Sequence, residues 1–153
     1  MSIKSQRLTA ENFKKFGKIV SLPEKKPTSE DKTYKFWSDI ANYHIDGKTE
    51  IGLCTVYKQD SIVINGMEKH NETPEILIPI DAPFILPLQK EGDDSLQAFK
   101  VDPGEAVVID PGIWHGACIP FAVPECTYFV IFKHGTPHQD VYFKEIHPSE
   151  INE

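Results

Sequence analysis

Two short segments of the chain, residues 66–75 and 103–115, carry the side chains that are best suited to chemistry. The first supplies Glu68, His70 and Glu75, and the second supplies His115 shortly after a Pro-Gly turn. Imidazole nitrogens and carboxylate oxygens bind borderline divalent cations such as Mn, Fe, Ni or Zn, and the same groups act as acids and bases. These residue types therefore predict a metal site or an acid/base site, provided that the fold brings the two segments together.

The spacing within the first segment indicates how its polar side chains are oriented. Glu68 and His70 are two residues apart, so on a strand they face the same way, while Met67 and Lys69 face the other way. A polar pair on the inner face is the reverse of what a simple apolar core needs, which favours a pocket. The alternative interpretation is a solvated charged loop, formed by Glu68, Lys69 and Glu72, in which His70 merely lies.

Short apolar runs separated by prolines and glycines follow one another from residue 50 onward. They predict strands at residues 50–57, 61–67, 75–80, 83–88, 96–101, 106–109, 115–120 and 126–134. Many short strands at nearly regular spacing are typical of a β-sandwich or a β-barrel. We therefore expect an all-β fold, in which a small antiparallel barrel brings the four side chains to one point in its mouth.

The N-terminal part and the tail complete the expected organisation. A short helix is predicted from Thr9 to Gly17, because Thr9 can cap its start and Gly17 can end it in a left-handed turn. Residues 22–32 predict an exposed loop, residues 34–45 a strand before a turn, and residues 141–153 a strand or a docked arm. The length of 153 residues predicts one domain, with residues 1–47 packed as a flanking segment on a barrel core at 48–146.

The composition argues against several classes of partner and chemistry. A net charge of −7 argues against a nucleic acid or an anionic membrane as the partner. The sequence contains no P-loop, no paired-glycine dinucleotide fingerprint and no G-x-S-x-G elbow, so we expect no organic cofactor. Residues 1–7 are polar, and no run approaches the roughly 18 apolar residues that a membrane helix needs. We therefore expect a cytoplasmic protein that acts on a small molecule.

The two polar segments together resemble the two motifs of the cupin family. In the first cupin motif, His-x-His is followed by Glu; here Glu68 replaces the first His, and His70 and Glu75 match the other two positions. In the second motif a Pro-Gly turn precedes a His, and here 111–112 and His115 match its end. The resemblance implies a double-stranded β-helix, or jelly-roll, barrel with a metal site in its mouth.

A narrower resemblance, to the ureidoglycolate lyase family, covers most of the chain. The segments that carry it are Leu8 to Gly17 followed by Ile19-Val20, Glu68-Lys69-His70 followed by Ile78-Pro79, Trp114-His115 followed by Pro120-Phe121, and Lys133 followed by Gly135 and a polar loop that reaches Asp140-Val141. The chain departs from the family pattern at Gly112-Ile113, where an Asn is expected, and at Lys133, where an Arg is expected. A Lys binds a carboxylate as a point charge and not as a bidentate partner.

The resemblance implies a carbon–nitrogen lyase of the amidine-lyase type, which acts in purine (allantoin) catabolism. Such an enzyme cleaves ureidoglycolate, a small α-hydroxy acid, to glyoxylate and urea. It also implies a homodimer, in which the N-terminal segment could be exchanged between subunits. His134 and His138 are expected at the surface, where either could line a pocket shared by the two subunits.

The resemblance also assigns roles to individual residues. A divalent metal held by His70, Glu75 and His115 would chelate the substrate, with Glu68 either as a fourth ligand or as the catalytic base. Lys133 would hold the substrate's carboxylate. Without a metal, His115 and Glu68 would carry out the acid/base chemistry directly. The alternative function is a non-catalytic or sugar-modifying cupin that binds a small acid or a sugar.

Overall fold

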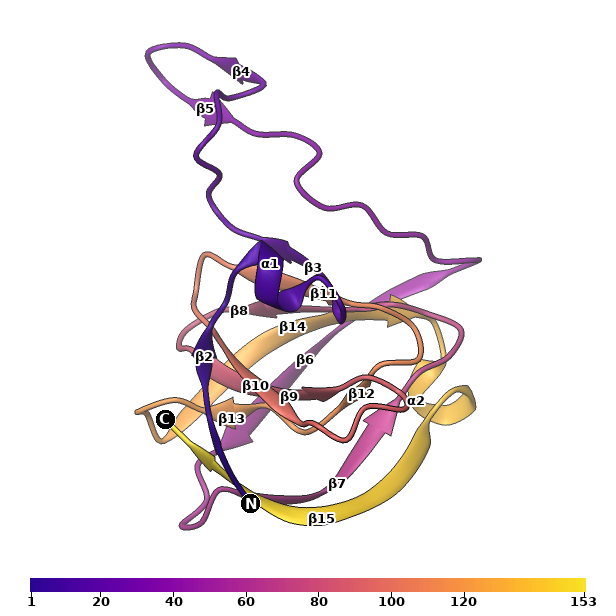
Figure 1. The fold of residues 1–153 in the computed structure, drawn as a ribbon. Helices are drawn as coiled ribbons and strands as arrows, with labels where there is room; N and C mark the ends of the chain where they lie inside the picture. Colours follow the sequence, from indigo (N-terminus) through magenta and orange to yellow (C-terminus); the bar gives the residue numbers. More distant parts are fainter.

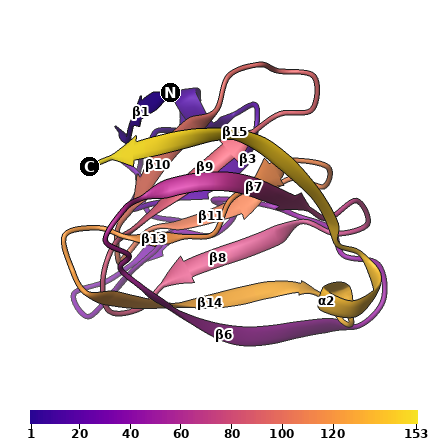
Figure 2. The same ribbon diagram turned by 90° about the horizontal axis from the view of Figure 1, so that it is seen from below.

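The computed structural model describes residues 1–153, nearly half of which lie in two β-sheets that face each other (Figures 1 and 2). The large, eight-stranded sheet contains, in order, β1 (Ser2–Lys4), β15 (Tyr142–Asn152), β7 (Val63–Lys69), β12 (Trp114–His115), β9 (Phe84–Gln89), β10 (Gln97–Val101) and β2 (Gln6–Arg7), with β13 (Ile119–Pro120) also paired to β9. The small, five-stranded sheet contains, in order, β3 (Gly17–Val20), β11 (Ala106–Ile109), β8 (Glu75–Pro79), β14 (Glu125–Lys133) and β6 (Thr49–Tyr57). The prediction of an all-β barrel is confirmed.

Apolar side chains from the inner faces of both sheets form the main core. It contains sixteen buried residues, among them Phe84, Leu88 and Phe99 from the large sheet and Leu77 and Val107 from the small sheet. Strand alternation explains this selection, because every second residue of a strand faces the opposite sheet. A core of this size sets the distance between the two sheets. That distance in turn sets how much space remains at the end of the barrel where His70, Glu75 and His115 lie.

One predicted strand is interrupted in the structure. Residues 115–120 were expected to form a single strand, but they form β12 and β13, which both pair with β9. His115 pairs with Leu88 and Ile119 pairs with Ile85, so one extra residue is accommodated on this side, as in a β-bulge. Gly116 still donates a hydrogen bond to the Pro87 carbonyl at 2.9 Å, so the extra residue lies between Gly116 and Ile119. An added Cβ at Gly116 would lie 3.2 Å from the Pro87 ring.

The predicted N-terminal helix is shorter than expected. The α1 helix spans only Ala10–Phe13, although the Thr9 side chain caps it and the Asn12 side chain accepts a hydrogen bond from the Thr9 backbone N–H. Gly17 does not end the helix, because it already belongs to β3, where it pairs with Ile109. Its φ is +151°, and an added Cβ would lie 1.8 Å from the carbonyl oxygen of Val108. The chain must therefore leave the helix early in order to join the small sheet.

The prediction of a strand at residues 34–45 is wrong. Only β5 (Lys35–Phe36) forms there, and it pairs with β4 (Ser29–Glu30) in a hairpin that projects from the barrel (Figure 1). The apolar residues that suggested the strand do not face a core, since Tyr34, Phe36 and Tyr43 remain about half exposed. We call residues 21–48 the arm. The expected flanking segment 1–47 therefore packs on the barrel up to Val20 and again at Ala41 and Tyr43, which line a cavity with Ile76 and Ile131 of the small sheet.

The two ends of the chain lie side by side and belong to the barrel. β1 pairs in parallel with the end of β15, with Ser2 opposite Glu150 (Figure 1). β15 also pairs with β7, so the tail forms a strand, as one of the two predicted alternatives had it. Because β1 to β3 and the end of β15 are strands of the two sheets, the structure does not set apart a barrel core at 48–146. The two helices, α1 and α2 (Thr136–Gln139), have four residues each, and no helix is long and apolar enough to cross a membrane.

We expect Gly17→Ala to lower the free energy of unfolding by more than about 3 kcal/mol, because the added methyl group meets the Val108 backbone in a disfavoured region of φ. Gly47→Ala is the matched control. Gly47 has a φ of +80° but no atom within 4 Å of the added Cβ, so only the backbone strain of about 1 kcal/mol remains. Guanidinium chloride denaturation of both variants measures the difference. Equal losses would contradict the close approach of β3 and β11.

Candidate functional site

Strand pairing brings the four predicted site residues to one end of the barrel. β7 carries Glu68 and ends just before His70, and β12 places His115 directly opposite Glu68 in the large sheet. Glu75 begins β8 in the small sheet, where it pairs with Ile109 of β11. The large sheet therefore supplies Glu68 and His115, the small sheet supplies Glu75, and the connection between β7 and β8 supplies His70.

The side chains of His70, Glu75 and His115 converge in the interior. Glu75 Oε2 lies 3.0 Å from His115 Nε2 and 3.6 Å from His70 Nε2. The two imidazole ring centres are 5.2 Å apart, and all three residues are less than a tenth exposed. The interpretation of the first segment as a solvated loop is therefore wrong for His70, because the chain turns inward after β7.

A carbonyl group fixes the orientation of His70. Its Nδ1 lies 2.7 Å from the carbonyl oxygen of Asp140, which can only accept a hydrogen bond, so Nδ1 carries the proton and donates it. The other nitrogen, Nε2, then presents its lone pair toward Glu75. The buried Asp140 carboxylate also accepts hydrogen bonds from the backbone N–H groups of Asn71 at 3.0 Å and Glu72 at 2.8 Å. Asp140 thus holds both the ring of His70 and the loop that follows it.

The donor atoms of this cluster fit a divalent metal ion. His70 Nε2, Glu75 Oε2 and His115 Nε2 are buried and make no hydrogen bond of acceptable geometry, although buried polar atoms are normally paired. Glu68, His70 and His115 also each offer a ligand atom within 4.8 Å of the other two. Two imidazole nitrogens and one or two carboxylates are a donor set that Mn, Fe, Ni or Zn accepts. No Lys or Arg side chain lies among these donor atoms, so no positively charged side chain takes the place of such an ion.

Electrostatic coupling shifts the pKa values of His70 and Glu75 in opposite directions. Burial is the largest single effect on His70 and lowers its pKa, but the Glu75 carboxylate and the Asp140 carbonyl outweigh it, so the pKa is raised overall. Burial likewise raises the pKa of Glu75, but His115 and His70 together bring it below its ordinary value. The cluster therefore favours an ionised Glu75 beside imidazoles that bind a positive charge, either a proton or a metal.

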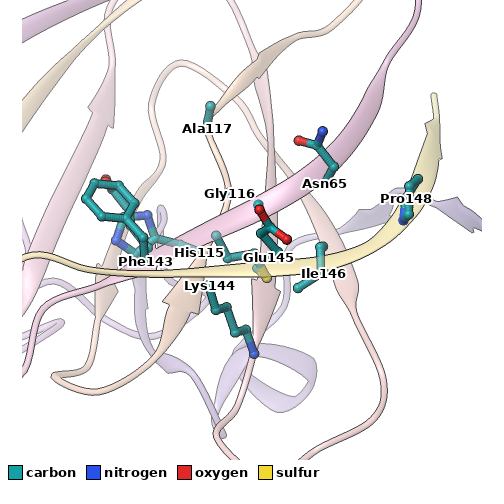
Figure 3. Close-up of a pocket in the computed structure, with 12 residues that line it drawn as sticks. Asn65, His115, Gly116, Ala117, Phe143, Lys144, Glu145, Ile146 and Pro148 are labelled. Atoms are coloured by element: carbon teal, nitrogen blue, oxygen red, sulfur yellow. The ribbon is translucent and has the colours of Figure 1, made fainter.

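A cavity of about 340 Å³ lies next to the cluster and could hold a small substrate. Its carboxylate and imidazole walls are the side chains of Glu50, Glu68, Glu75 and His115, and no Lys or Arg lines it. A wider cavity of about 790 Å³ shares Glu68, His115 and Gly116 with it and opens between β7, β12 and β15 (Figure 3). In Figure 3 the side chains of Lys144 and Asn65 point in opposite directions. The inner cavity is therefore acidic unless a cation occupies the cluster.

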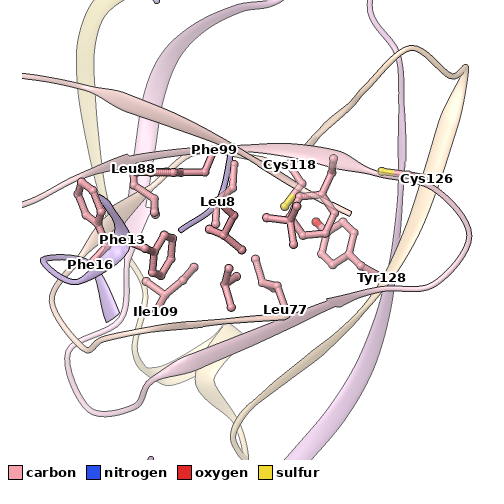
Figure 4. Close-up of a cluster of buried hydrophobic side chains, with 14 of the residues drawn as sticks. Leu8, Phe13, Phe16, Leu77, Leu88, Phe99, Ile109, Cys118, Cys126 and Tyr128 are labelled. Carbon is pink, nitrogen blue, oxygen red and sulfur yellow. The ribbon is translucent and has the colours of Figure 1, made fainter. Parts of the chain in front are cut away.

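The other end of the inner cavity is less polar. Cys54, Cys118 and Tyr128 line it, and Cys118 and Tyr128 also belong to the main core (Figure 4). Burial raises the pKa values of Cys118 and Tyr128, so that the thiol and the phenol stay neutral. Cys126, in the same core, has its pKa raised to about 11, mainly by burial. These thiols stay protonated, which leaves the imidazoles and carboxylates as the metal-binding end of the cavity.

Lys133 does not line the inner cavity, and the carboxylate-binding role expected for it stays a prediction. Its neighbour Phe132 lines the inner cavity and packs against His70, so alternation along β14 turns Lys133 toward the outer face of the small sheet. There its charge acts on Asp46, whose pKa is lowered mainly by His44 and to a lesser extent by Lys133. The histidines His134 and His138 are exposed, as expected.

Trp114 also lies outside the cavity, behind His115. It is buried on the outer face of the large sheet under two cations, with Lys69 Nζ 4.6 Å and Lys144 Nζ 4.5 Å from its ring. Its indole nitrogen donates a hydrogen bond to Glu91 at 2.6 Å. Trp114 therefore anchors β12 and does not contact a ligand beside His115.

Two residues that the sequence did not single out contribute to the site. Asp140 orients His70, but it entered only as part of a family pattern, without a role. Glu50 lines the inner cavity from β6, 18 positions before Glu68, in a stretch without a recognisable motif. Only the pairing of β6 with β14 shows that Glu50 lies in the same cavity as Glu75.

The fold and the site together define a class of protein. It is a small β-barrel with a buried cluster of histidines and carboxylates at the end of an interior cavity. The family model for ureidoglycolate lyase matches residues 1–151, so the chain belongs to the ureidoglycolate lyase family. The sequence-based resemblance to this family is thereby confirmed.

Comparison with solved structures adds remote similarities only. Peruvianin-I, a cysteine peptidase from Thevetia peruviana latex, is 12% identical over 64% of this chain and 55% of its own, with a TM-score of 0.48. Oxalate decarboxylase of Bacillus subtilis is 16% identical over 61% of this chain and 23% of its own, with a TM-score of 0.48. Oxalate decarboxylase of Lactobacillus farciminis is 11% identical over 61% and 26%, also with a TM-score of 0.48.

This chain thus spans about half the length of the first of these structures and about a quarter of the other two. The scores lie below 0.5, so the fold is defined by its strand order and not by these similarities. No curated protein sequence matches the chain significantly.

We expect Glu75→Gln to lower the pKa of His70 in the metal-free protein. The variant removes the charge that raises this pKa and leaves the burial that lowers it. An NMR titration of the imidazole C–H resonances measures the shift. Glu125→Gln, which removes an exposed carboxylate at the start of β14, is the control and should leave the pKa of His70 unchanged. An unchanged or raised pKa in Glu75→Gln would contradict the coupling.

Proposed function

We propose that the protein is a ureidoglycolate lyase, which cleaves ureidoglycolate to glyoxylate and urea with the help of a bound divalent metal. The family match over residues 1–151 supports the reaction. The observation that carries the metal-assisted form is the convergence of three buried donor atoms, on His70, Glu75 and His115, beside a cavity of substrate size. The cytoplasmic location expected from the sequence is part of the same proposal.

The chemistry of the substrate defines what the site must do. In ureidoglycolate one carbon carries both the hydroxyl group and the urea nitrogen. Removal of the hydroxyl proton lets the C–O bond become a carbonyl, the C–N bond breaks, and the departing urea nitrogen takes up a proton. The reaction therefore needs a base near the hydroxyl, a proton donor near the nitrogen and a positive charge near the carboxylate.

The acidic cavity explains why a cation is needed. A substrate carboxylate that enters it meets Glu50, Glu68 and Glu75 and no basic side chain other than His115. Repulsion between like charges is strong in a site from which water is partly excluded. A divalent ion held by His70, Glu75 and His115 would offset this charge, and it supplies Lewis-acid polarisation that lowers the pKa of a coordinated hydroxyl.

Among the carboxylates, Glu68 is best placed to act as the base. Glu75 is buried between two imidazoles, whereas Glu68 is half-buried and lines both the inner and the wider cavity. Glu68 also lies opposite His115 in the sheet, so a hydroxyl group bound beside His115 comes within its reach. In this arrangement Glu75 and the two histidines hold the ion, and Glu68 accepts the hydroxyl proton.

We expect His70→Ala and Glu75→Ala to reduce urea release from ureidoglycolate by at least about a hundredfold, and to lose bound metal, because each removes a ligand from a preformed pocket. Turnover is measured with Mn, Fe, Ni and Zn added in turn, and metal content by elemental analysis. His147→Ala, at an exposed position of β15, is the control. If the folded wild-type protein releases no urea with any of these ions, the lyase proposal fails and a small-acid binding barrel replaces it.

We also propose that the protein forms a homodimer through the arm and β6. The arm exposes Tyr34 and Phe36, and β6 is an edge strand whose Ile51 and Leu53 are about two thirds exposed. Exposed apolar residues beside an unpaired strand edge favour association.

We expect light scattering to give twice the chain mass of 17.3 kDa for the wild type. The double variant Ile51→Glu with Leu53→Glu should give the monomer mass, because two charges on the edge strand oppose apolar contact. Val63→Glu, another exposed apolar position but on the large sheet, is the control. A monomeric wild type would overturn the dimer proposal and leave the lyase proposal intact.

A further inference from the structure

Glu50 is a third carboxylate in the inner cavity, and the cluster of histidines does not use it. It lies on β6 opposite Phe132 of β14, while Glu75 precedes Ile76, the partner of Ile131. Glu50, Phe132 and Glu75 therefore form one row across the inner face of the small sheet. Two strand spacings separate the first and last members of this row, which is about 10 Å.

One oxygen of Glu50 is fixed by the turn that follows β14. Oε2 accepts a hydrogen bond from the backbone N–H of Gly135 at 3.0 Å and lies 3.2 Å from His134 Nδ1. Gly135 has a φ of +84°, which lets the chain turn tightly into α2 and aim its N–H at this carboxylate. The side chain is 32% exposed, so it sits at the rim of the cavity. The other oxygen, Oε1, has no protein donor.

The free oxygen of Glu50 defines the kind of ligand group that fits there. A carboxylate accepts hydrogen bonds and repels another carboxylate, so it favours a group that presents N–H donors. Because the backbones of Glu50 and Glu75 are about 10 Å apart, a ligand that contacts both side chains must be only a few covalent bonds long. The carboxyl carbon and the terminal nitrogen of ureidoglycolate are four bonds apart.

We propose that Glu50 recognises the ureido group of the substrate, an inference that rests on the proposed lyase function. Its free oxygen accepts the N–H hydrogen bonds of the urea part, while the carboxylate and hydroxyl of the substrate face His70, Glu75 and His115. Glu50 thereby sets the direction in which the substrate lies and selects ureido compounds over other α-hydroxy acids. The leaving urea is then released at the rim formed by Gly135 and Pro137.

Steady-state kinetics of Glu50→Ala and Glu50→Gln test this role. We expect Glu50→Ala to raise KM for ureidoglycolate by about tenfold to a hundredfold with a smaller change in kcat, because a charge-assisted hydrogen bond is lost from the bound substrate. Glu50→Gln keeps one acceptor oxygen and should show a smaller rise. Wild type should discriminate against ureidoglycolate dimethylated on its terminal nitrogen, and Glu50→Ala should lose this discrimination. The control is Glu125→Gln, at an exposed position.

A second measurement does not depend on turnover. Added urea should shift the Gly135 N–H resonance of wild type and leave it unshifted in Glu50→Ala. An active wild type whose KM, discrimination and urea response are unchanged in Glu50→Ala would overturn the inference alone. A wild type without turnover whose Gly135 still responds to urea through Glu50 would overturn the lyase function and keep the urea site. If neither turnover nor a urea response occurs, both proposals are overturned.

Discussion

One ionised side chain buried between two imidazoles is the constraint on which the rest of the structure depends. Taking a carboxylate such as Glu75 out of water costs several kcal/mol unless nearby charges and hydrogen bonds compensate. His70 and His115 provide this compensation only while a proton or a metal ion is shared among them. The two sheets must therefore stay at the separation that lets these groups meet, and the aromatic and aliphatic core beneath them sets that separation.

The same constraint explains why residues remote in sequence support the site. Asp140 is 70 positions from His70, yet its carbonyl fixes the His70 tautomer and its carboxylate fixes the adjacent loop. A bulge follows Gly116, shortly after His115, and Trp114 anchors the same strand from behind. The geometry of the cluster is thus maintained from both faces of the large sheet.

Sequence patterns predicted the strands well where neighbouring strands bury one face, as in β6 to β11 and β14. They failed in the arm, because Tyr34 and Phe36 have strand-forming side chains but no sheet in the barrel to join. The spacing of the two motifs identified His70 and His115, because His70 directly follows β7 and His115 lies in β12. Their positions are therefore set by the local sequence of one short strand each. Motif spacing could not place Lys133 on the outer face or Glu50 in the cavity, because the register of β14 against its neighbours decides both.

The position of β15 in the large sheet has a consequence for folding. β15 lies between β1 and β7, so the large sheet stays open until a strand remote in sequence from β7 has joined it. Asp140, which orients His70, lies just before β15, so the cluster is complete only when this long-range pairing has formed. Pairing between distant segments forms slowly, and until then the open sheet exposes strand edges of the kind that promote misassembly.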